Sequence, residues 1–292
     1  MMNIACIGIG AVGSIIAREL KMTTLDVDLY SRTGSGSFTI YENDAFTTYD
    51  YPVYPVDEIG NKVYDIIFIA AKATALEYLK SIIPEMSHDG TEVILCQNGM
   101  GYDHWFEKSV PSVVYISGQK KEDHIEHFRD SKLIIKDKKY RYIDTLINLI
   151  EEDGDISLEI KKVHDFEKLR YEKLLINLGV NTMTALSQNT ARIFRDGDMV
   201  ALTRKLLKEG QAVINHRSHV ITDEFIEEAI ELFKSYPDHM GTSMYYDVMN
   251  KTPTEYAFIQ KYFYDNKKDL DTPVLDVTCT LLKGYSIGKE KN

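Results

Sequence analysis

The stretch G-I-G-A-V-G, residues 8–13, restricts the fold of this chain more than any other feature. It follows the strand-like run N-I-A-C-I and leads directly into the helix-like run S-I-I-A-R-E-L. In that setting Gly8 permits a tight turn, Gly10 permits close approach of a pyrophosphate, and Gly13 permits the helix to pack on the strand. The pattern predicts a dinucleotide site at a helix N-terminus, with a purely structural glycine turn as the alternative. The expected cofactor contacts in this loop are Gly8, Ile9, Gly10, Ala11, Val12 and Gly13.

The hydrophobic periodicity of the chain changes near residue 165. Before that point, short β-type runs such as D-I-I-F-I-A-A alternate with helical patterns, which is typical of βαβ units and a parallel sheet. After it, long helical periods such as E-F-I-E-E-A-I-E-L-F-K take over. We therefore expect an α/β fold with two domains: an N-terminal Rossmann-type domain with a doubly wound sheet over residues 1–165, and a C-terminal all-α domain over residues 166–292.

Charge and composition argue against several classes of protein. A formal net charge of −11 and a pI of about 5.3 disfavour nucleic acid and anionic membrane surfaces as partners. The N-terminus lacks the positive segment of a signal peptide, and no apolar run reaches the length of a membrane span, so we expect a cytoplasmic protein. Cys6, Cys96 and Cys279 are far apart in sequence, and the histidines show no metal-ligand spacing. We expect neither a disulfide nor a metal site.

The end of the second predicted strand bears on the choice of cofactor. The run L-D-V-D-L-Y leads into Ser31 and Arg32, where an NAD-dependent enzyme usually has an acidic residue for the ribose 2′-hydroxyl. A hydroxyl and a guanidinium suit a 2′-phosphate instead. We therefore expect NADPH rather than NADH. The alternative is that Arg32 is a solvated arginine after a strand.

Two further polar residues follow predicted strands. Lys72 comes after D-I-I-F-I-A-A, and Asn98 comes after E-V-I-L-C-Q. In an open α/β sheet the carboxyl ends of the strands form the ligand crevice, so both side chains are candidates for contact with cofactor or substrate. A solvated lysine and an Asn-Gly turn are the alternatives.

A polar stripe interrupts the apolar run Y-E-K-L-L-I-N-L-G-V-N-T-M-T-A-L. Lys173, Asn177 and Asn181 are spaced four residues apart, so they lie along one face of a helix. Their neighbours are apolar nearly all round, which predicts a buried helix. Buried polar groups need partners, and either neighbouring helices or a ligand must supply them.

These motifs together resemble the ketopantoate reductase (2-dehydropantoate 2-reductase) family along nearly the whole chain. The resemblance rests on G-I-G-A-V-G, A-A-K-A, Q-N-G-M-G, the lysine-asparagine helix, T-S-M-Y-Y-D, P-T-E and D-T-P. It implies NADPH-dependent reduction of ketopantoate to pantoate on the way to pantothenate and coenzyme A. The helix and the S-M-x-x-D element are its most specific parts.

The resemblance also implies roles for the helix residues. Lys173 matches the general acid of the family, and Asn177 and Asn181 match the residues that hold the hydroxyl and carboxylate region of the substrate. The chemistry agrees with these roles, since hydride transfer to a ketone creates an alkoxide that a nearby ammonium can stabilise and protonate.

Four more positions take their roles from the same resemblance. Lys72 matches a lysine in the cleft, and Asn98 matches an asparagine that contacts both nicotinamide and substrate. Ser243 matches the serine that binds the substrate carboxylate, and Glu255 matches an acid near the cofactor and the catalytic lysine. From the residues alone, a helix N-cap for Ser243 and a surface carboxylate for Glu255 are the alternatives.

Some positions depart from the family pattern. Met240 and Ala191 stand where the resemblance leads us to expect asparagines, and Lys120 and Lys121 stand where small residues are common. The alternatives for the function are therefore a related reductase of another 2-keto acid and a catalytically silent NADPH-binding regulator. For Lys120 and Lys121 the alternative to substrate binding is a solvated loop. The resemblance implies a monomer or a dimer, and the tyrosine-rich helical half favours a homodimer.

Overall fold

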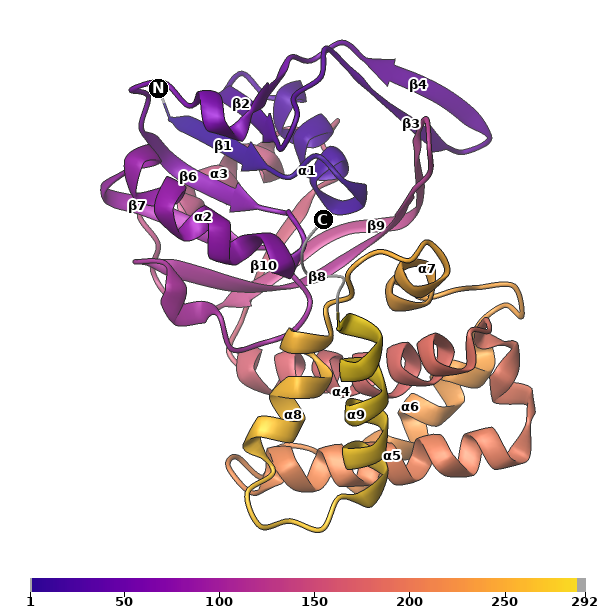
Figure 1. Cartoon of the computed structure of the whole chain (residues 1–292). Coiled ribbons are helices and arrows are strands. Elements are labelled where there is room, and N and C mark those ends of the chain that lie inside the picture. The colour runs from indigo at the N-terminus through magenta and orange to yellow at the C-terminus, as the bar shows by residue number, and fades with distance from the viewer. Residues whose placement is uncertain (1, 288–292) are drawn as a thin grey trace. The chain divides into compact units, whose positions relative to one another are not determined.

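The computed structural model describes residues 2–287, apart from the side chain of Arg129. Within this range the chain divides into two compact units. The first contains residues 2–97 and 102–166, and the second contains residues 98–101 and 167–287 (Figure 1). Residues 98–101 thus group with the second unit, although they lie in the middle of the first unit in sequence.

The first unit contains a sheet of ten strands within the described residues. The strands are β1 (Asn3–Ile7), β2 (Asp26–Ser31), β3 (Phe38–Glu42), β4 (Ala45–Tyr49), β5 (Val53–Pro55), β6 (Tyr64–Ile69), β7 (Ser87–Leu95), β8 (Ser109–Lys120), β9 (Ile125–Lys136) and β10 (Glu159–Val163). The helices and 3-10 turns are α1 (Ala11–Met22), η1 (Val56–Glu58), η2 (Ala73–Ala75), α2 (Leu76–Ile82), η3 (Ile83–Met86), η4 (Asp103–Trp105) and α3 (Ile143–Glu152).

The strand order confirms the predicted α/β fold class. It runs β4-β3-β9-β8-β7-β6-β1-β2-β5, with β10 paired to β9. All neighbours from β5 to β8 in this order are parallel. On one side of β1 lie β2 and then β5, and on the other side lie β6 and then β7, which is the doubly wound arrangement of a Rossmann-type sheet. The hairpin of β3 and β4, which lies between β2 and β5 in sequence, pairs with β9 at the far edge. The ligand crevice of such a sheet lies where the strand order reverses, at the carboxyl ends of β1 and β6.

The core of this unit explains the continuous apolar character of β1. Ile4, Ala5 and Cys6 are fully buried, as are Ile15 and Ile16 of α1. Because β1 lies in the middle of the sheet, both of its faces are buried and its sequence does not alternate. Helix α1 packs against β1 and against the long strands β8 and β9.

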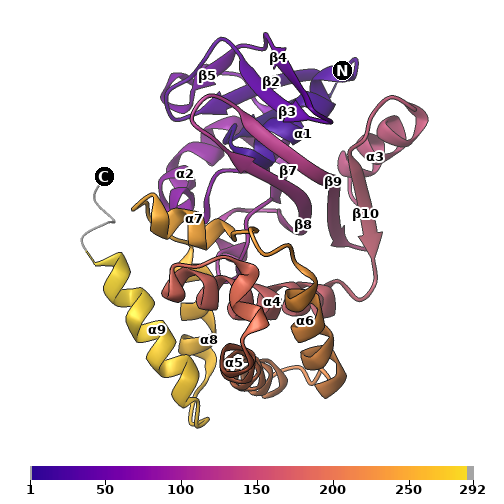
Figure 2. The ribbon, with the colours of Figure 1, turned by 90° about the vertical axis from the view of Figure 1, so that its right-hand side faces the viewer.

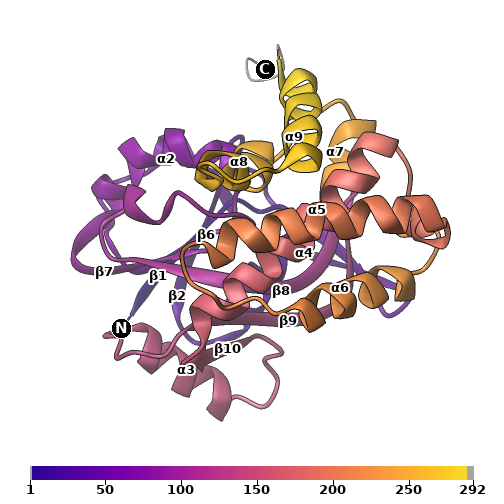
Figure 3. The ribbon, with the colours of Figure 1, turned by 90° about the horizontal axis from the view of Figure 1, so that it is seen from below.

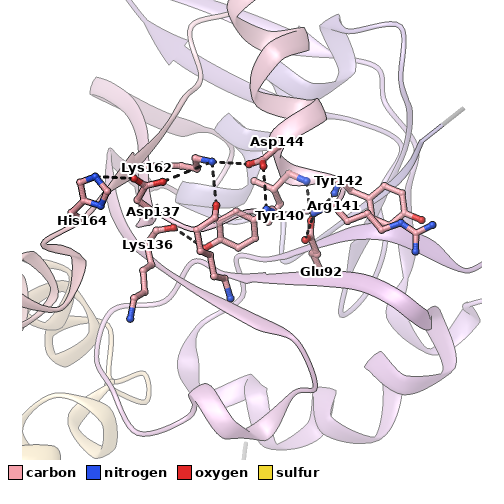
Figure 4. Close-up of polar contacts among 11 residues, drawn as sticks. Glu92, Lys136, Asp137, Tyr140, Arg141, Tyr142, Asp144, Lys162 and His164 are labelled. Atoms are coloured by element: carbon pink, nitrogen blue, oxygen red, sulfur yellow. Dashed lines mark hydrogen bonds and ion pairs between the residues drawn. The ribbon is translucent and has the colours of Figure 1, made fainter.

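Helix α3 is held to the sheet by side-chain contacts (Figure 4). The buried carboxylate of Glu92, on β7, accepts the backbone N–H groups of Arg141 at 2.8 Å and Tyr142 at 3.0 Å. A carboxylate at this position satisfies free N–H groups and complements the positive end of the helix dipole. The ammonium of Lys162, on β10, donates to Asp144 at 3.0 Å. This polar cluster therefore fixes α3 beside β10 (Figure 2).

The second unit is helical in the described residues outside the 98–101 loop and the connections. Its helices and 3-10 turns are α4 (Phe166–Ser187), η5 (Ala191–Arg195), α5 (Gly197–Asn215), α6 (Asp223–Ser235), α7 (Ser243–Met249), η6 (Tyr256–Phe258), α8 (Gln260–Asn266) and α9 (Pro273–Ser286). Helix α5 contacts α6, α8 and α9 (Figure 3). The core includes Leu175, Leu178, Leu207, Phe233 and Phe263, all fully buried. Between residues 2 and 287, no helix has the length and apolar character required to cross a bilayer.

Candidate active site

The glycine loop has the geometry that the fingerprint predicts. Gly8 has a φ of +98°, and a Cβ there would lie 2.3 Å from the backbone nitrogen of Ala71. A Cβ on Gly13 would lie 2.0 Å from the carbonyl oxygen of Gly8. At Gly10, by contrast, a Cβ would meet no heavy atom within 4 Å. Gly8 and Gly13 are therefore required by the fold, whereas Gly10 leaves open space at the N-terminus of α1, where N–H groups favour an anion.

The ends of three parallel strands meet at this loop. The N–H of Gly8 donates to the carbonyl oxygen of Tyr30 on β2 at 2.7 Å, and the N–H of Ala70 donates to that of Ile7 at 2.8 Å. Lys72 follows β6 and is exposed. The residues after β1, β2 and β6 therefore form one edge of the first unit.

Gln97, which was not predicted from the sequence as a site residue, holds the segment that leads into Lys72 in place. Gln97 is 6% exposed, and its Nε2 donates to the carbonyl oxygens of Ile69 at 2.6 Å and Ala71 at 3.0 Å. The amide thereby fixes the backbone that leads into Lys72. The only signal in the sequence is a polar residue at the end of an apolar strand, which does not distinguish a brace from a ligand contact.

The end of β2 carries no carboxylate beside the glycine loop. Ser31 ends the strand and is partly buried, and Arg32 is exposed. The two carboxylates further back on the strand are engaged by Lys62, whose ammonium lies 2.8 Å from Asp26 and 2.6 Å from Asp28. The residue that ends β2 and the residue after it thus carry a hydroxyl and a guanidinium, which fit a phosphate better than a neutral ribose hydroxyl.

The predicted polar stripe lies on α4 in the second unit. Lys173 is partly buried, and Asn177 and Asn181 are 8% and 4% exposed. Burial lowers the pKa of the Lys173 ammonium below the ordinary value for lysine, because low-polarity surroundings disfavour the charged form. The Nδ2 of Asn177 lies 3.5 Å from the Oδ1 of Asn98. The structure therefore brings Asn98 to the α4 stripe.

The 98–101 loop is held by the segment that follows Glu255. The N–H of Met100 donates to the carbonyl oxygen of Phe258 at 2.9 Å. Gly99 has a φ of +97°, and a Cβ there would lie 2.5 Å from the same oxygen. Glu255 is 9% exposed and directly precedes η6. Asn98 and the Glu255 turn therefore belong to one locally packed region with α4.

Ser243 does not cap α7, which removes one alternative interpretation. The N-cap is Thr242, whose Oγ1 accepts the N–H of Tyr245 at 3.1 Å. Ser243 is exposed at the first helical position. The Thr242 hydroxyl also lies 2.8 Å from that of Thr184 on α4. Sequence reasoning did not find this contact, because threonine pairs between distant helices leave no local pattern.

The positions that depart from the family pattern fall into two groups. The N–H of Ala191 donates to the carbonyl oxygen of Met240 at 2.8 Å, so these two positions are neighbours in the second unit. Lys120 ends β8, and Lys121 lies in the turn to β9, where its ammonium is 3.2 Å from Glu126. Lys121 is thus paired within its own hairpin.

This arrangement can perform acid catalysis and bind oxygen atoms. An ammonium with a lowered pKa is a stronger acid than ordinary lysine, and nearby amides can orient neutral or anionic oxygens. In the part of the chain that the structure describes, no group of three or more His, Cys, Asp or Glu side chains is placed to hold a metal ion.

Comparison with known proteins identifies the family. The model of the ketopantoate reductase PanE/ApbA family matches residues 4–140, and that of its C-terminal domain matches residues 165–286. A dimeric ketopantoate reductase from Staphylococcus aureus, known from a solved structure, is 32% identical with a TM-score of 0.91, covering 99% of this chain and 100% of that one. A 2-dehydropantoate 2-reductase from Mycobacterium tuberculosis is 25% identical over 297 residues, 98% of each chain.

A more distant structure shares the fold alone. D-mandelate dehydrogenase, solved with NADH and anilino(oxo)acetate, is 19% identical with a TM-score of 0.83 over 98% of each chain. Both halves of the chain match the family models, and the S. aureus enzyme is similar over the full length. The chain is therefore an oxidoreductase of the ketopantoate reductase PanE/ApbA family.

Proposed function

We propose that the protein reduces ketopantoate to pantoate with NADPH, the step that leads to pantothenate and coenzyme A. The observation that supports this most strongly is the α4 stripe. It places an ammonium of lowered pKa on the same helix face as two buried amides, and one of these amides contacts Asn98. Reduction of a ketone next to a carboxylate requires a proton donor and polar groups that bind oxygen atoms, and these side chains can supply both.

The first unit supports NADPH as the cofactor. The open space at Gly10 and the N-terminus of α1 suit a pyrophosphate, and Ser31 and Arg32 suit a 2′-phosphate. Lys62 engages both carboxylates of β2. When bound, the cofactor supplies the hydride. The chain would hold it through residues 8–13, Ser31, Arg32 and Lys72, and the family resemblance adds Asn98 and Glu255 as cofactor contacts.

The residues of the second unit donate the proton and orient the substrate. As the ketone oxygen gains negative charge, the Lys173 ammonium stabilises it and then donates a proton to it. Asn177 and Asn181 orient the hydroxyl and carboxylate region through amide N–H groups. The Ser243 hydroxyl donates to the carboxylate of the substrate, and Lys72 adds positive charge beside the glycine loop.

A second candidate is reduction of a different 2-keto acid. The observation in its favour is that Ala191 and Met240, both in place of the asparagines that the family resemblance leads us to expect, are neighbours joined by a backbone hydrogen bond. Loss of two amides at one place would change which groups of a substrate are recognised, because a site built to hydrogen-bond discriminates strongly against partners that lack the matching group.

We further propose that the protein is a homodimer, because the S. aureus relative is described as dimeric and is similar over its full length. Equilibrium sedimentation tests this directly. A single species at the dimer mass of two 33.5 kDa chains is expected, and a monomer at micromolar concentration would remove the idea.

The function is tested by NADPH oxidation with purified protein. Ketopantoate is compared with pyruvate and with a bulkier 2-keto acid, and NADPH is compared with NADH. We expect rapid turnover with ketopantoate and NADPH. Turnover of another keto acid only would favour the second candidate. Tight NADPH binding without turnover of any keto acid would contradict both and indicate a silent regulator.

A further inference from the structure

Two buried threonines join α4 to the start of α7. The hydroxyl oxygens of Thr184 and Thr242 lie 2.8 Å apart, and these residues are 0% and 8% exposed. Thr242 also accepts the N–H of Tyr245 at 3.1 Å, and the Thr184 hydroxyl donates to the carbonyl oxygen of Val180 at 2.7 Å. Because each hydroxyl has one proton, the chain of bonds has one direction: Thr242 donates to Thr184, and Thr184 donates to Val180.

This hydroxyl link, formed by Thr184 and Thr242, lies next to two residues of the proposed substrate site. Thr184 follows Asn181 by three residues on α4, so it lies on the adjacent part of the helix surface. Thr242 directly precedes Ser243. The link therefore connects the backbone that carries the Asn181 amide to the backbone that carries the Ser243 hydroxyl.

A buried glutamine makes a second connection between the same two segments. The Nε2 of Gln260 donates to the hydroxyl of Thr182 at 3.0 Å and lies 3.5 Å from the sulfur of Met244. Thr182 follows Asn181, and Met244 follows Ser243. Gln260 is fully buried, and its Oε1 has no hydrogen-bond partner within the described residues. A buried acceptor without a partner lowers the stability of the fold, so stability alone does not explain why this amide is present.

We propose that Thr184, Thr242 and Gln260 are positioning residues that fix the Ser243 hydroxyl relative to the Asn181 amide, so that both reach the carboxylate region of one 2-keto acid. The inference rests on the proposed function, which assigns these two residues to substrate binding. Loss of the link would let the start of α7 shift against α4, and a site that binds through hydrogen bonds holds its ligand less tightly when the residues that support its donors are removed. The effect should therefore appear in KM rather than in kcat.

The test uses Thr184→Val, which removes the hydroxyl and keeps the shape of the side chain. The matched control is Thr203→Val on α5, because Thr203 is equally buried and its hydroxyl donates to the carbonyl oxygen of Met199, four residues back, at 2.7 Å. We expect Thr184→Val to raise KM for ketopantoate about fivefold, equivalent to ~1 kcal/mol, with kcat nearly unchanged. Thr184→Ser should restore KM, and Thr203→Val should leave it unchanged.

Equal KM values for Thr184→Val and the wild type, with the same fall in Tm as in Thr203→Val, would overturn the inference. If Thr184→Val does not fold, Thr242→Ala replaces it. Its matched control is Thr222→Ala, which removes the corresponding N-cap of α6, where the Thr222 hydroxyl accepts the N–H of Phe225 at 3.3 Å. A higher KM in Thr242→Ala alone supports the link, and equal KM values in the two variants contradict it.

Calorimetric titration of ketopantoate into the NADPH-loaded protein separates this inference from the proposed function. Binding without turnover in the wild type would contradict the function, while the Kd of Thr184→Val would still test the link. Turnover in the wild type with an unchanged Kd in Thr184→Val would contradict the link alone. No binding to the wild type would overturn both.

Discussion

The glycine loop of the first unit and the α4 stripe of the second are both candidate binding regions, but different forces fix them. Steric contact between backbone atoms sets the loop, since a Cβ at Gly8 or Gly13 would collide with main-chain atoms. Hydrogen bonds from distant segments set the surroundings of the stripe, such as that between Asn177 and Asn98. The steric constraint depends on glycines at a fixed local spacing in the sequence, whereas the hydrogen bonds join residues that are far apart in the sequence.

The largest expected effect of a substitution is at Lys173. Lys173→Ala should lower kcat by about 10²- to 10⁴-fold, the usual contribution of a general acid, while NADPH binding and Tm remain near those of the wild type. Steady-state kinetics with ketopantoate and a fluorescence titration of NADPH measure the two properties. Lys168→Ala is the control, because Lys168 lies on the same helix but is exposed and paired with Glu172 at 3.8 Å. Equal kcat values for the two variants would contradict the assignment.

Two glycine substitutions test the loop side of the comparison. Gly13→Ala should lower the free energy of unfolding by ~1–3 kcal/mol, because its Cβ would meet the Gly8 carbonyl oxygen and the backbone would have to shift. Gly10→Ala should cost less than ~1 kcal/mol but raise the Kd of NADPH at least about tenfold, because its Cβ would enter the space assigned to the pyrophosphate. Chemical denaturation and NADPH titration give both values. Unchanged NADPH affinity in Gly10→Ala would place the pyrophosphate elsewhere.

A smaller effect is expected at Arg32. Arg32→Ala should raise the Kd of NADPH about tenfold through loss of a charge-assisted hydrogen bond to the 2′-phosphate. The Kd of NADH serves as the internal control and should not change. A parallel rise for both cofactors would indicate a general structural effect, and no change for either would make Arg32 a solvated residue.

The difference between the two regions also explains which features of the molecule could be predicted from its sequence. The α/β fold class, the glycine loop between a strand and a helix, and the polar stripe on a buried helix follow from local patterns of spacing and periodicity, and the structure shows each of these features. The tertiary contacts that these features make could not be predicted from such local patterns. Nothing in the periodicity indicates that residues 98–101 group with the helices, that Gln97 braces the Lys72 segment, or that Thr242 rather than Ser243 caps α7. Such contacts depend on the tertiary arrangement, which no single segment encodes.

The pH dependence of stability gives a further check on Lys173. Because its pKa is lowered in the folded state, the unfolded chain holds more protons between the folded and unfolded pKa values. Its contribution to the free energy of unfolding is therefore unfavourable below the folded pKa and diminishes as pH rises toward the ordinary lysine value of about 10.4. Denaturation of the wild type and Lys173→Met across this range should show a smaller rise with pH in the variant. Parallel curves would contradict a lowered pKa.

The most direct test of the central claim is the pH profile of kcat for ketopantoate reduction in the wild type and in Lys173→Ala. The acid must be protonated to act, so activity should be complete below the pKa of Lys173 and fall as pH rises through it. We expect a basic limb in the wild type at a pH below the ordinary lysine pKa of about 10.4, and no such limb in the residual activity of the variant. The same basic limb in both proteins would show that another group donates the proton.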